Sequence, residues 1–224
     1  MSNSSGLMGR IYVISEWIVR FSFTNLLWIL FNLPIAFLFL NLLLVDQIEA
    51  VISLLLPLLF LMPILFFPAT TAMFAVVRGW IMQTEDSKSY WHYYKENYKR
   101  SVVNGLILTS IWLIWAVDLY YFFDKNKIMG AVFIVLGILL FVFTINLFSV
   151  TVHYHMKWLP AFKNTFLLTI GSPMLFISVA ISSGIILFVS FTVVKFLLPL
   201  LAGSLIAFLS FSAFHRSYLN LVKS

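Results

Sequence analysis

The sequence contains no cysteine, which excludes disulfide bonds, thiolate catalysis and cysteine-based metal sites. Charged residues are also scarce, at 10% of the 224 residues. A soluble domain carries about a quarter charged residues. Because 62% of the residues are hydrophobic, the chain has more apolar surface than one soluble core can bury. The lipid bilayer is therefore the expected solvent and partner of most of the chain.

Motifs of the common enzyme classes are missing as well. The chain holds no G-x-S-x-G, H-E-x-x-H, P-loop or G-x-G-x-x-G pattern. His153 and His155 lie two residues apart with no carboxylate nearby, and side chains at that spacing diverge on a helix. We therefore expect no catalytic residue, no metal site and no cofactor, and we predict that the protein is not an enzyme.

What the sequence does contain is long apolar stretches. Six of them are long enough to cross about 30 Å of hydrocarbon as helices, whereas barrel strands would be shorter and alternate in polarity. They predict an all-α transmembrane bundle of about six spans in a single domain, 1–224. The last two apolar stretches are separated by little more than Lys195. They are therefore either two separate crossings or a re-entrant hairpin. The stretches are 21–42, 50–80, 102–122, 128–152, 172–194 and 196–214.

Basic residues are distributed unevenly between the two sides of such a bundle. With a cytoplasmic N-terminus, eleven Lys and Arg lie on one side, and three lie on the other, at Lys125, Lys127 and Lys195. The positive-inside rule then places both termini in the cytoplasm, and we predict a multi-pass protein of the bacterial cytoplasmic membrane. The eleven are Arg10, Arg20, Arg78, Lys88, Lys95, Lys99, Arg100, Lys157, Lys163, Arg216 and Lys223.

The second stretch carries signals for a bend and for close packing. Three prolines predict kinks or a break in its helix: Pro57, Pro63 and Pro68. Small residues then recur at intervals of four, a spacing that lets another helix approach closely, at Thr71, Ala75 and Gly79. Two interpretations follow. The segment is a kinked packing helix, or it is a broken helix that lines a substrate path.

Four polar residues lie within apolar runs and form a candidate polar path: Asn25, Asn32, Asp118 and Asn146. Buried amides either join helices through hydrogen bonds or bind a hydroxyl-rich solute, since an amide both donates and accepts. An intramembrane carboxylate is a functional candidate by default. Asp118 also lies close to the end of its span, beside two tyrosines, so a solvated interfacial aspartate and a proton or cation relay are both open.

The segment YWHYYKENYKR (90–100) combines aromatic and charged residues. On a helix, four of its aromatic residues lie largely on one side: Tyr90, Trp91, Tyr94 and Tyr98. Lys95, Lys99 and Arg100 take much of the other side. This pattern predicts a cytoplasmic amphipathic helix near 88–100 at the bilayer interface, with a partner-docking surface as the alternative. We expect no nucleic-acid partner, because such rings are better used at a membrane.

Two arginines stand where predicted spans meet the cytoplasm. Arg20 and Arg78 are expected to reach out to lipid phosphates. Glu16 lies four residues before Arg20, the spacing of a helical ion pair. Arg78 therefore belongs with the predicted interfacial or docking residues.

Three segments resemble the YesL-like family of bacterial integral membrane proteins, which is classed as a domain of unknown function. They are NLLWILFNLP (25–34), FPATTAMFAVVRGW (67–80) and YWHYYKENYKRSVVNG (90–105). Family members often have glycine before the proline, where this chain has Phe67. The resemblance implies a multi-pass protein that is often encoded beside carbohydrate uptake systems. It implies no particular binding or catalytic residue.

Together these observations favour a non-enzymatic accessory component linked to carbohydrate uptake, with a carbohydrate transport system as the expected partner. The alternative is a small secondary transporter or permease with its solute path at the kinked second span. Oligomerisation is open in both cases.

Overall fold

The computed structural model describes residues 7–83, 88–154 and 156–223, and these ranges contain helices and no strand. Two short segments, η1 and η2, are π-helical, so their turns are wider than those of an α-helix. In chain order the elements are α1 (Leu7–Leu42), α2 (Ile48–Leu61), η1 (Met62–Phe66), α3 (Phe67–Met82), α4 (Tyr90–Phe123), α5 (Lys127–His153), α6 (Trp158–Gly171), α7 (Pro173–Thr192), η2 (Leu198–Ala202) and α8 (Gly203–Lys223).

Six helical stretches within the described ranges are long and apolar enough to cross a membrane. This confirms the predicted all-α architecture with six candidate spans, and the protein is a multi-pass membrane protein. The third stretch begins about a dozen residues before the predicted one, because the helix already includes the amphipathic segment. The six are Gly9–Leu42, Ile48–Met82, Tyr90–Phe123, Lys127–His153, Pro173–Thr192 and Leu198–Asn220.

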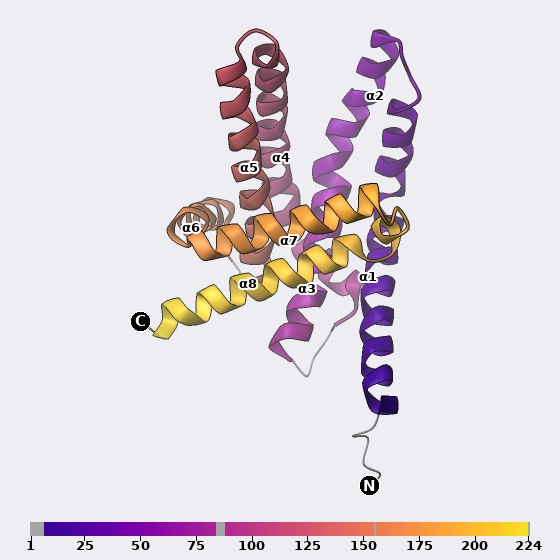
Figure 1. Cartoon of the computed structure of the whole chain (residues 1–224), viewed down its shortest axis with the longest axis vertical. Coiled ribbons are helices and arrows are strands. Elements are labelled where there is room, and N and C mark those ends of the chain that lie inside the picture. Colours follow the sequence, from indigo (N-terminus) through magenta and orange to yellow (C-terminus); the bar gives the residue numbers. More distant parts are fainter. Residues whose placement is uncertain (1–6, 84–87, 155, 224) are drawn as a thin grey trace.

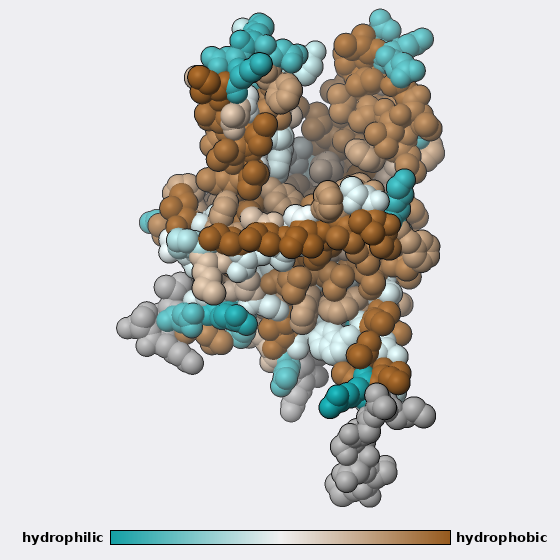
Figure 2. Space-filling model, in the orientation of Figure 1, coloured by the Kyte–Doolittle hydropathy of each residue, from teal (hydrophilic) through white to brown (hydrophobic). Residues whose placement is uncertain are grey.

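The helices form two long hairpins with a third hairpin lying across them (Figure 1). The turn between α1 and α2 and the turn between α4 and α5 lie at the same end of the molecule, and α7 and α8 run crosswise. We call the other end, which carries Arg10, Arg20, Arg78 and Lys88, the basic end. Apolar surface covers most of the face between the two ends (Figure 2).

The proline-rich second span bends without breaking. Pro63 lies in the first turn of η1, between α2 and α3. Proline lacks an N–H group and clashes with the preceding turn, and the wider π-turn accommodates both effects. The predicted kink therefore takes the form of a π-helical segment. Gly105 of α4 packs against it so closely that an added Cβ would lie 2.9 Å from the Cα of Pro63.

Helix α3 is the centre of the packed core. The predicted small-residue ridge on it, Thr71, Ala75 and Gly79, is buried. This helix packs against α4, α5 and α8. The hydroxyl of Thr71 donates to the carbonyl of Phe67 at 2.8 Å, one of the bonds that satisfy the backbone beside Pro68. The burial of the ridge agrees with its predicted role in close helix packing.

Helix α8 packs against the basic ends of the long helices. The ring of Phe208 lies 5.4 Å from that of Trp17 and 5.3 Å from that of Phe21, both in α1. Near the other end of α8, the ring of Tyr218 lies 4.6 Å from that of His153, the last residue of α5. Such edge-to-face aromatic contacts add to the free energy of burial itself. Helix α8 thus bridges α1 and α5.

The start of α8 is joined to α1 through the fully buried amide of Asn25. Its Nδ2 donates to the carbonyl of Pro199 at 2.7 Å and to that of Leu198 at 3.3 Å. Its Oδ1 accepts from the backbone N–H of Ser204 at 3.1 Å. Gly203 permits this approach, because an added Cβ would lie 2.7 Å from that oxygen. The predicted hydrogen-bonding role of Asn25 between helices is therefore observed.

We expect Asn25→Leu to lower the stability of the protein by about 1–3 kcal/mol, since it leaves buried backbone groups of η2 and α8 without partners. The thermal unfolding midpoint of the detergent-solubilised protein measures this loss. Asn41→Leu is the matched control, because within the described ranges the side chain of Asn41 bonds only to Phe37 of its own helix, and its loss should change the midpoint little. Equal midpoints for both variants would contradict the structural role of Asn25.

Candidate functional site

The four residues of the predicted polar path make separate contacts. Asn25 bonds to η2 and α8, whereas Asn146 of α5 donates to the hydroxyl of Thr169 in α6 at 3.1 Å. Asn32 donates to the carbonyl of Trp28 in its own helix. Asp118 is partly exposed near the end of α4 farthest from the basic end, and it forms no hydrogen bond or ion pair within the described ranges. The contacts do not bring these residues into one cavity, so the path stays a prediction.

The segment 90–100 forms the first turns of α4, and the hydroxyl of Ser89 caps its start by accepting from His92 N–H at 3.3 Å. Tyr90 and Tyr94, predicted at the interface, are only 5% and 8% exposed. The ring of Phe31 lies 4.6 Å from that of Tyr94, and the hydroxyl of Tyr90 donates to the carbonyl of Ala69 at 2.7 Å. These two tyrosines therefore fasten α4 to α1 and α3 instead of facing lipid.

The outward part of the same segment keeps its predicted character. Trp91 is 51% exposed and Tyr98 is 37% exposed. The ammonium of Lys95 lies 4.6 Å from the centre of the Trp91 ring, within the range of a cation–π interaction. Trp91 also stacks on Tyr94 at 5.6 Å. The Trp91 ring is thus about half exposed and is held in place by its stack on Tyr94. Lys99 is also exposed, and Arg100 donates to the side-chain oxygen of Asn97.

Arg78 has a different role from the predicted one. Its guanidinium donates to the carbonyl of Val152, in the last turn of α5. A cation suits this place, because the last carbonyls of a helix have no partner within it and carry partial negative charge. Arg78 therefore caps α5 instead of reaching only for lipid. Arg20 forms the predicted ion pair with Glu16 at the surface.

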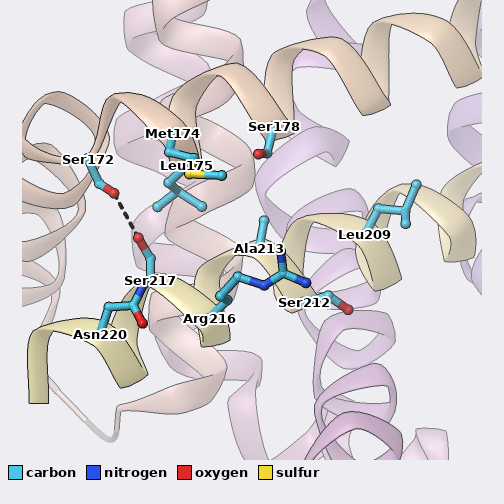
Figure 3. Close-up of a pocket in the computed structure, with 10 residues that line it drawn as sticks. All are labelled: Ser172, Met174, Leu175, Ser178, Leu209, Ser212, Ala213, Arg216, Ser217 and Asn220. Atoms are coloured by element: carbon cyan, nitrogen blue, oxygen red, sulfur yellow. Dashed lines mark hydrogen bonds between the residues drawn. The ribbon is translucent and has the colours of Figure 1, made fainter. Parts of the chain in front are cut away.

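A cavity of about 330 Å³ lies between the start of α7 and the second half of α8 (Figure 3). Its apolar lining comes from both helices, with Met174 and Leu175 on α7 and Leu209 on α8. The Ser172 and Ser217 hydroxyls, 2.7 Å apart, close one end, and the Arg216 side chain extends along α8 within the same lining (Figure 3). The remaining lining residues are Ser178, Ser212, Ala213 and Asn220.

The lining of this cavity combines one guanidinium, several hydroxyls and apolar side chains, and it contains no carboxylate. Such a lining can accept an amphipathic molecule with an anionic group. Sequence reasoning missed these residues. The available signal was the helical spacing of Leu209, Ser212, Arg216 and Asn220, which places them on one face of α8. His155, considered above as a metal ligand, lies outside the described ranges.

The observed geometry defines a multi-pass helical membrane protein whose polar contacts gather toward its basic end. Comparison with known proteins agrees, since residues 21–119 match a family described as "Protein of unknown function, DUF624". The chain belongs to this family, which is consistent with the YesL-like resemblance of its sequence.

The chain is also 31% identical over 159 residues to the "Uncharacterized protein YteU" of Bacillus subtilis (strain 168). The alignment covers 68% of this chain and 60% of that relative, so this chain spans less than two thirds of the relative's length. No solved structure matches the chain.

We expect Arg78→Met to destabilise the protein by about 1–3 kcal/mol, because it removes a charged donor from a partly buried carbonyl. Arg78→Lys should cost less, since it keeps the charge. Arg20→Met is the control, because an exposed ion pair contributes at most about 1 kcal/mol. Thermal unfolding in detergent ranks the three variants. A larger loss for Arg20→Met than for Arg78→Met would refute the capping role.

Proposed function

We propose that the protein is a non-enzymatic accessory component of a bacterial cytoplasmic membrane, and that it docks a partner protein of a carbohydrate uptake system at its basic end. The observation that carries this proposal is the first part of α1, which projects beyond the remaining helices at the basic end (Figure 1). Its surface is apolar although it extends past the crossing part of the helix.

The length of α1 supports this reading. Its apolar stretch, Gly9–Leu42, has 34 residues, and a crossing needs about 20. Counted from Leu42, a crossing of that length ends near Arg20, which forms its surface ion pair with Glu16. About 14 residues then lie beyond the hydrocarbon, on the side predicted to be cytoplasmic.

This projecting part of α1 exposes more apolar surface than water favours. Six large side chains along it are each at least 50% exposed: Ile11, Tyr12, Val13, Ile14, Ile18 and Val19. Contiguous exposed apolar surface on a protein marks an interaction site. A partner protein with an apolar groove or helix face of its own would cover these side chains.

The outward surface of α4 adds a second contact of suitable composition. Trp91 and Lys95 form an exposed aromatic and cationic pair, held in one conformation by the stack on Tyr94. Rigid aromatic residues are typical anchors of protein interfaces, because ordering them costs little conformational entropy.

The link to carbohydrate uptake is supported by the family resemblance. A transporter in its own right would need its polar residues to share a cavity, whereas Asn25 and Asn146 bond to different helices. These contacts favour the accessory role over the transporter.

We expect the double substitution Ile14→Ser and Ile18→Ser to reduce co-purification of the partner in mild detergent at least several-fold, because it removes apolar contact area from the docking helix. The matched control is Ile181→Ser and Ile185→Ser on α7, which have the same spacing and similar exposure. The control should retain the partner. Undiminished recovery with the α1 variant, or recovery of no partner by the natural chain, would refute docking through α1.

Trp91→Ala tests the second contact. It should weaken partner recovery while leaving the thermal unfolding midpoint close to that of the natural chain, since the ring is about half exposed. Trp158→Ala on α6 is the control, because Trp158 is 49% exposed and Trp91 is 51% exposed. Equal partner recovery from both variants would remove α4 from the docking surface.

A further inference from the structure

Helices α7 and α8 are long and apolar enough to cross a membrane, but the contacts of α8 restrict how it can lie. At its start, the hydroxyl of Ser204 donates to the carbonyl of Phe21 at 3.0 Å, next to Arg20 at the basic end of α1. Fourteen residues later, about 21 Å along the helix, Tyr218 contacts His153 at the basic end of α5. Both ends of α8 therefore meet the same side of the bundle.

A crossing helix would carry one of its ends to the opposite side of the bilayer. The middle of α8 shows the same pattern as its ends, because Phe208 contacts Trp17 and Phe21, both near the basic end. Helix α7 packs along α8, and Ser172 just before α7 bonds to Ser217 of α8. In Figure 1 both helices run across the long axes of α1 and α5.

From these contacts we propose that α7 and α8 form a hairpin in the plane of the cytoplasmic leaflet, and that this hairpin binds phospholipid with the phosphate group at Arg216. Four helical stretches then cross the membrane, within α1, α2 to α3, α4 and α5, and the predicted cytoplasmic position of both termini is unchanged.

With α7 and α8 in the plane of the leaflet, the basic residues are divided more unequally between the two sides of the membrane. Lys195, in the turn between α7 and η2, moves to the cytoplasmic side with the eleven other basic residues. Only Lys125 and Lys127 then stay on the far side, so the bias becomes twelve against two instead of eleven against three. The positive-inside rule therefore favours the in-plane hairpin over two further crossings.

The outward side of α7 provides a surface for acyl chains. Large apolar side chains recur on it every three or four residues and are each more than half exposed, and Figure 2 shows the apolar band that they form. A helix lying in a leaflet buries such a face among acyl chains and leaves its polar face to the headgroups. The stripe comprises Met174, Ile177, Ile181, Ile185, Phe188 and Phe191.

The cavity between α7 and α8 provides the headgroup site. Arg216 is exposed and makes no hydrogen bond or ion pair within the described ranges, and no carboxylate lines the cavity. Its other polar lining residues are Ser172, Ser178, Ser212, Ser217 and Asn220. Guanidinium and hydroxyl donors suit phosphate oxygens, while Met174 and Leu209 offer apolar contact to the rest of a lipid.

The orientation of the hairpin can be tested by cysteine labelling, because the natural chain has no cysteine. Lys195→Cys is compared with Lys88→Cys at the basic end and Lys125→Cys at the far end. A membrane-impermeant maleimide is applied to right-side-out and to inside-out membranes. We expect Lys195→Cys to react in the same preparation as Lys88→Cys. Reaction together with Lys125→Cys would overturn the proposal.

A second form of the test covers the case in which a cysteine at this position is shielded by lipid. A polar tag with a protease site is inserted after Lys195, and its cleavage is scored in the same two preparations. Cleavage in inside-out membranes is expected, and cleavage in right-side-out membranes would overturn the in-plane hairpin.

The phosphate site is tested by native mass spectrometry of protein purified in mild detergent with added anionic phospholipid. Arg216→Gln should weaken phospholipid binding about tenfold, because it removes the charged donor. Arg10→Gln is the control, since it removes an exposed arginine outside the cavity and should leave binding unchanged. Equal binding by Arg216→Gln and the natural chain would overturn the assignment of the phosphate to Arg216.

Discussion

The buried amide of Asn25 is the interaction on which the arrangement of the C-terminal third depends. In hydrocarbon an unsatisfied backbone group costs several kcal/mol, so a helix can bend only where its freed groups find other partners. Pro199 and the π-turn of η2 leave carbonyls without backbone partners. The Asn25 side chain, more than 170 residues away in sequence, donates hydrogen bonds to the carbonyls of Leu198 and Pro199. Because Gly203 lets the backbone come so close, α8 begins at α1, and this start determines where α7, α8 and the cavity between them lie.

The need to pair backbone groups in hydrocarbon also explains why helix packing is concentrated toward the basic end. There, Arg78 satisfies the end of α5, and α3 buries most of its residues among α1, α4, α5 and α8. Helix α2 has no buried residue, so lipid can cover much of its surface. The polar side chains that join helices, such as Asn25 and Arg78, therefore lie away from α2.

Sequence reasoning could predict what depends on apolar length and local spacing. The candidate spans, the bend at Pro63 and the buried ridge on α3 follow from these. It could not predict that Tyr90 and Tyr94 face inward, because helical spacing shows which residues share a face and not where that face points. Both tyrosines pack on Phe31, about 60 residues earlier in the sequence, and this contact decides their direction. The cavity was missed for a similar reason, since its two walls come from helices joined only by tertiary packing.

The lengths of the helices connect the two proposals. The apolar stretch that includes α1 has 34 residues, about 14 more than a crossing requires. A hairpin in the cytoplasmic leaflet packs Phe208 against Trp17 and Phe21, which supports the base of the projecting helix. The lipid-bound hairpin would then hold the docking part of α1 at a defined height above the headgroups. Because this docking surface would already be rigid, its binding to a partner would cost less conformational entropy.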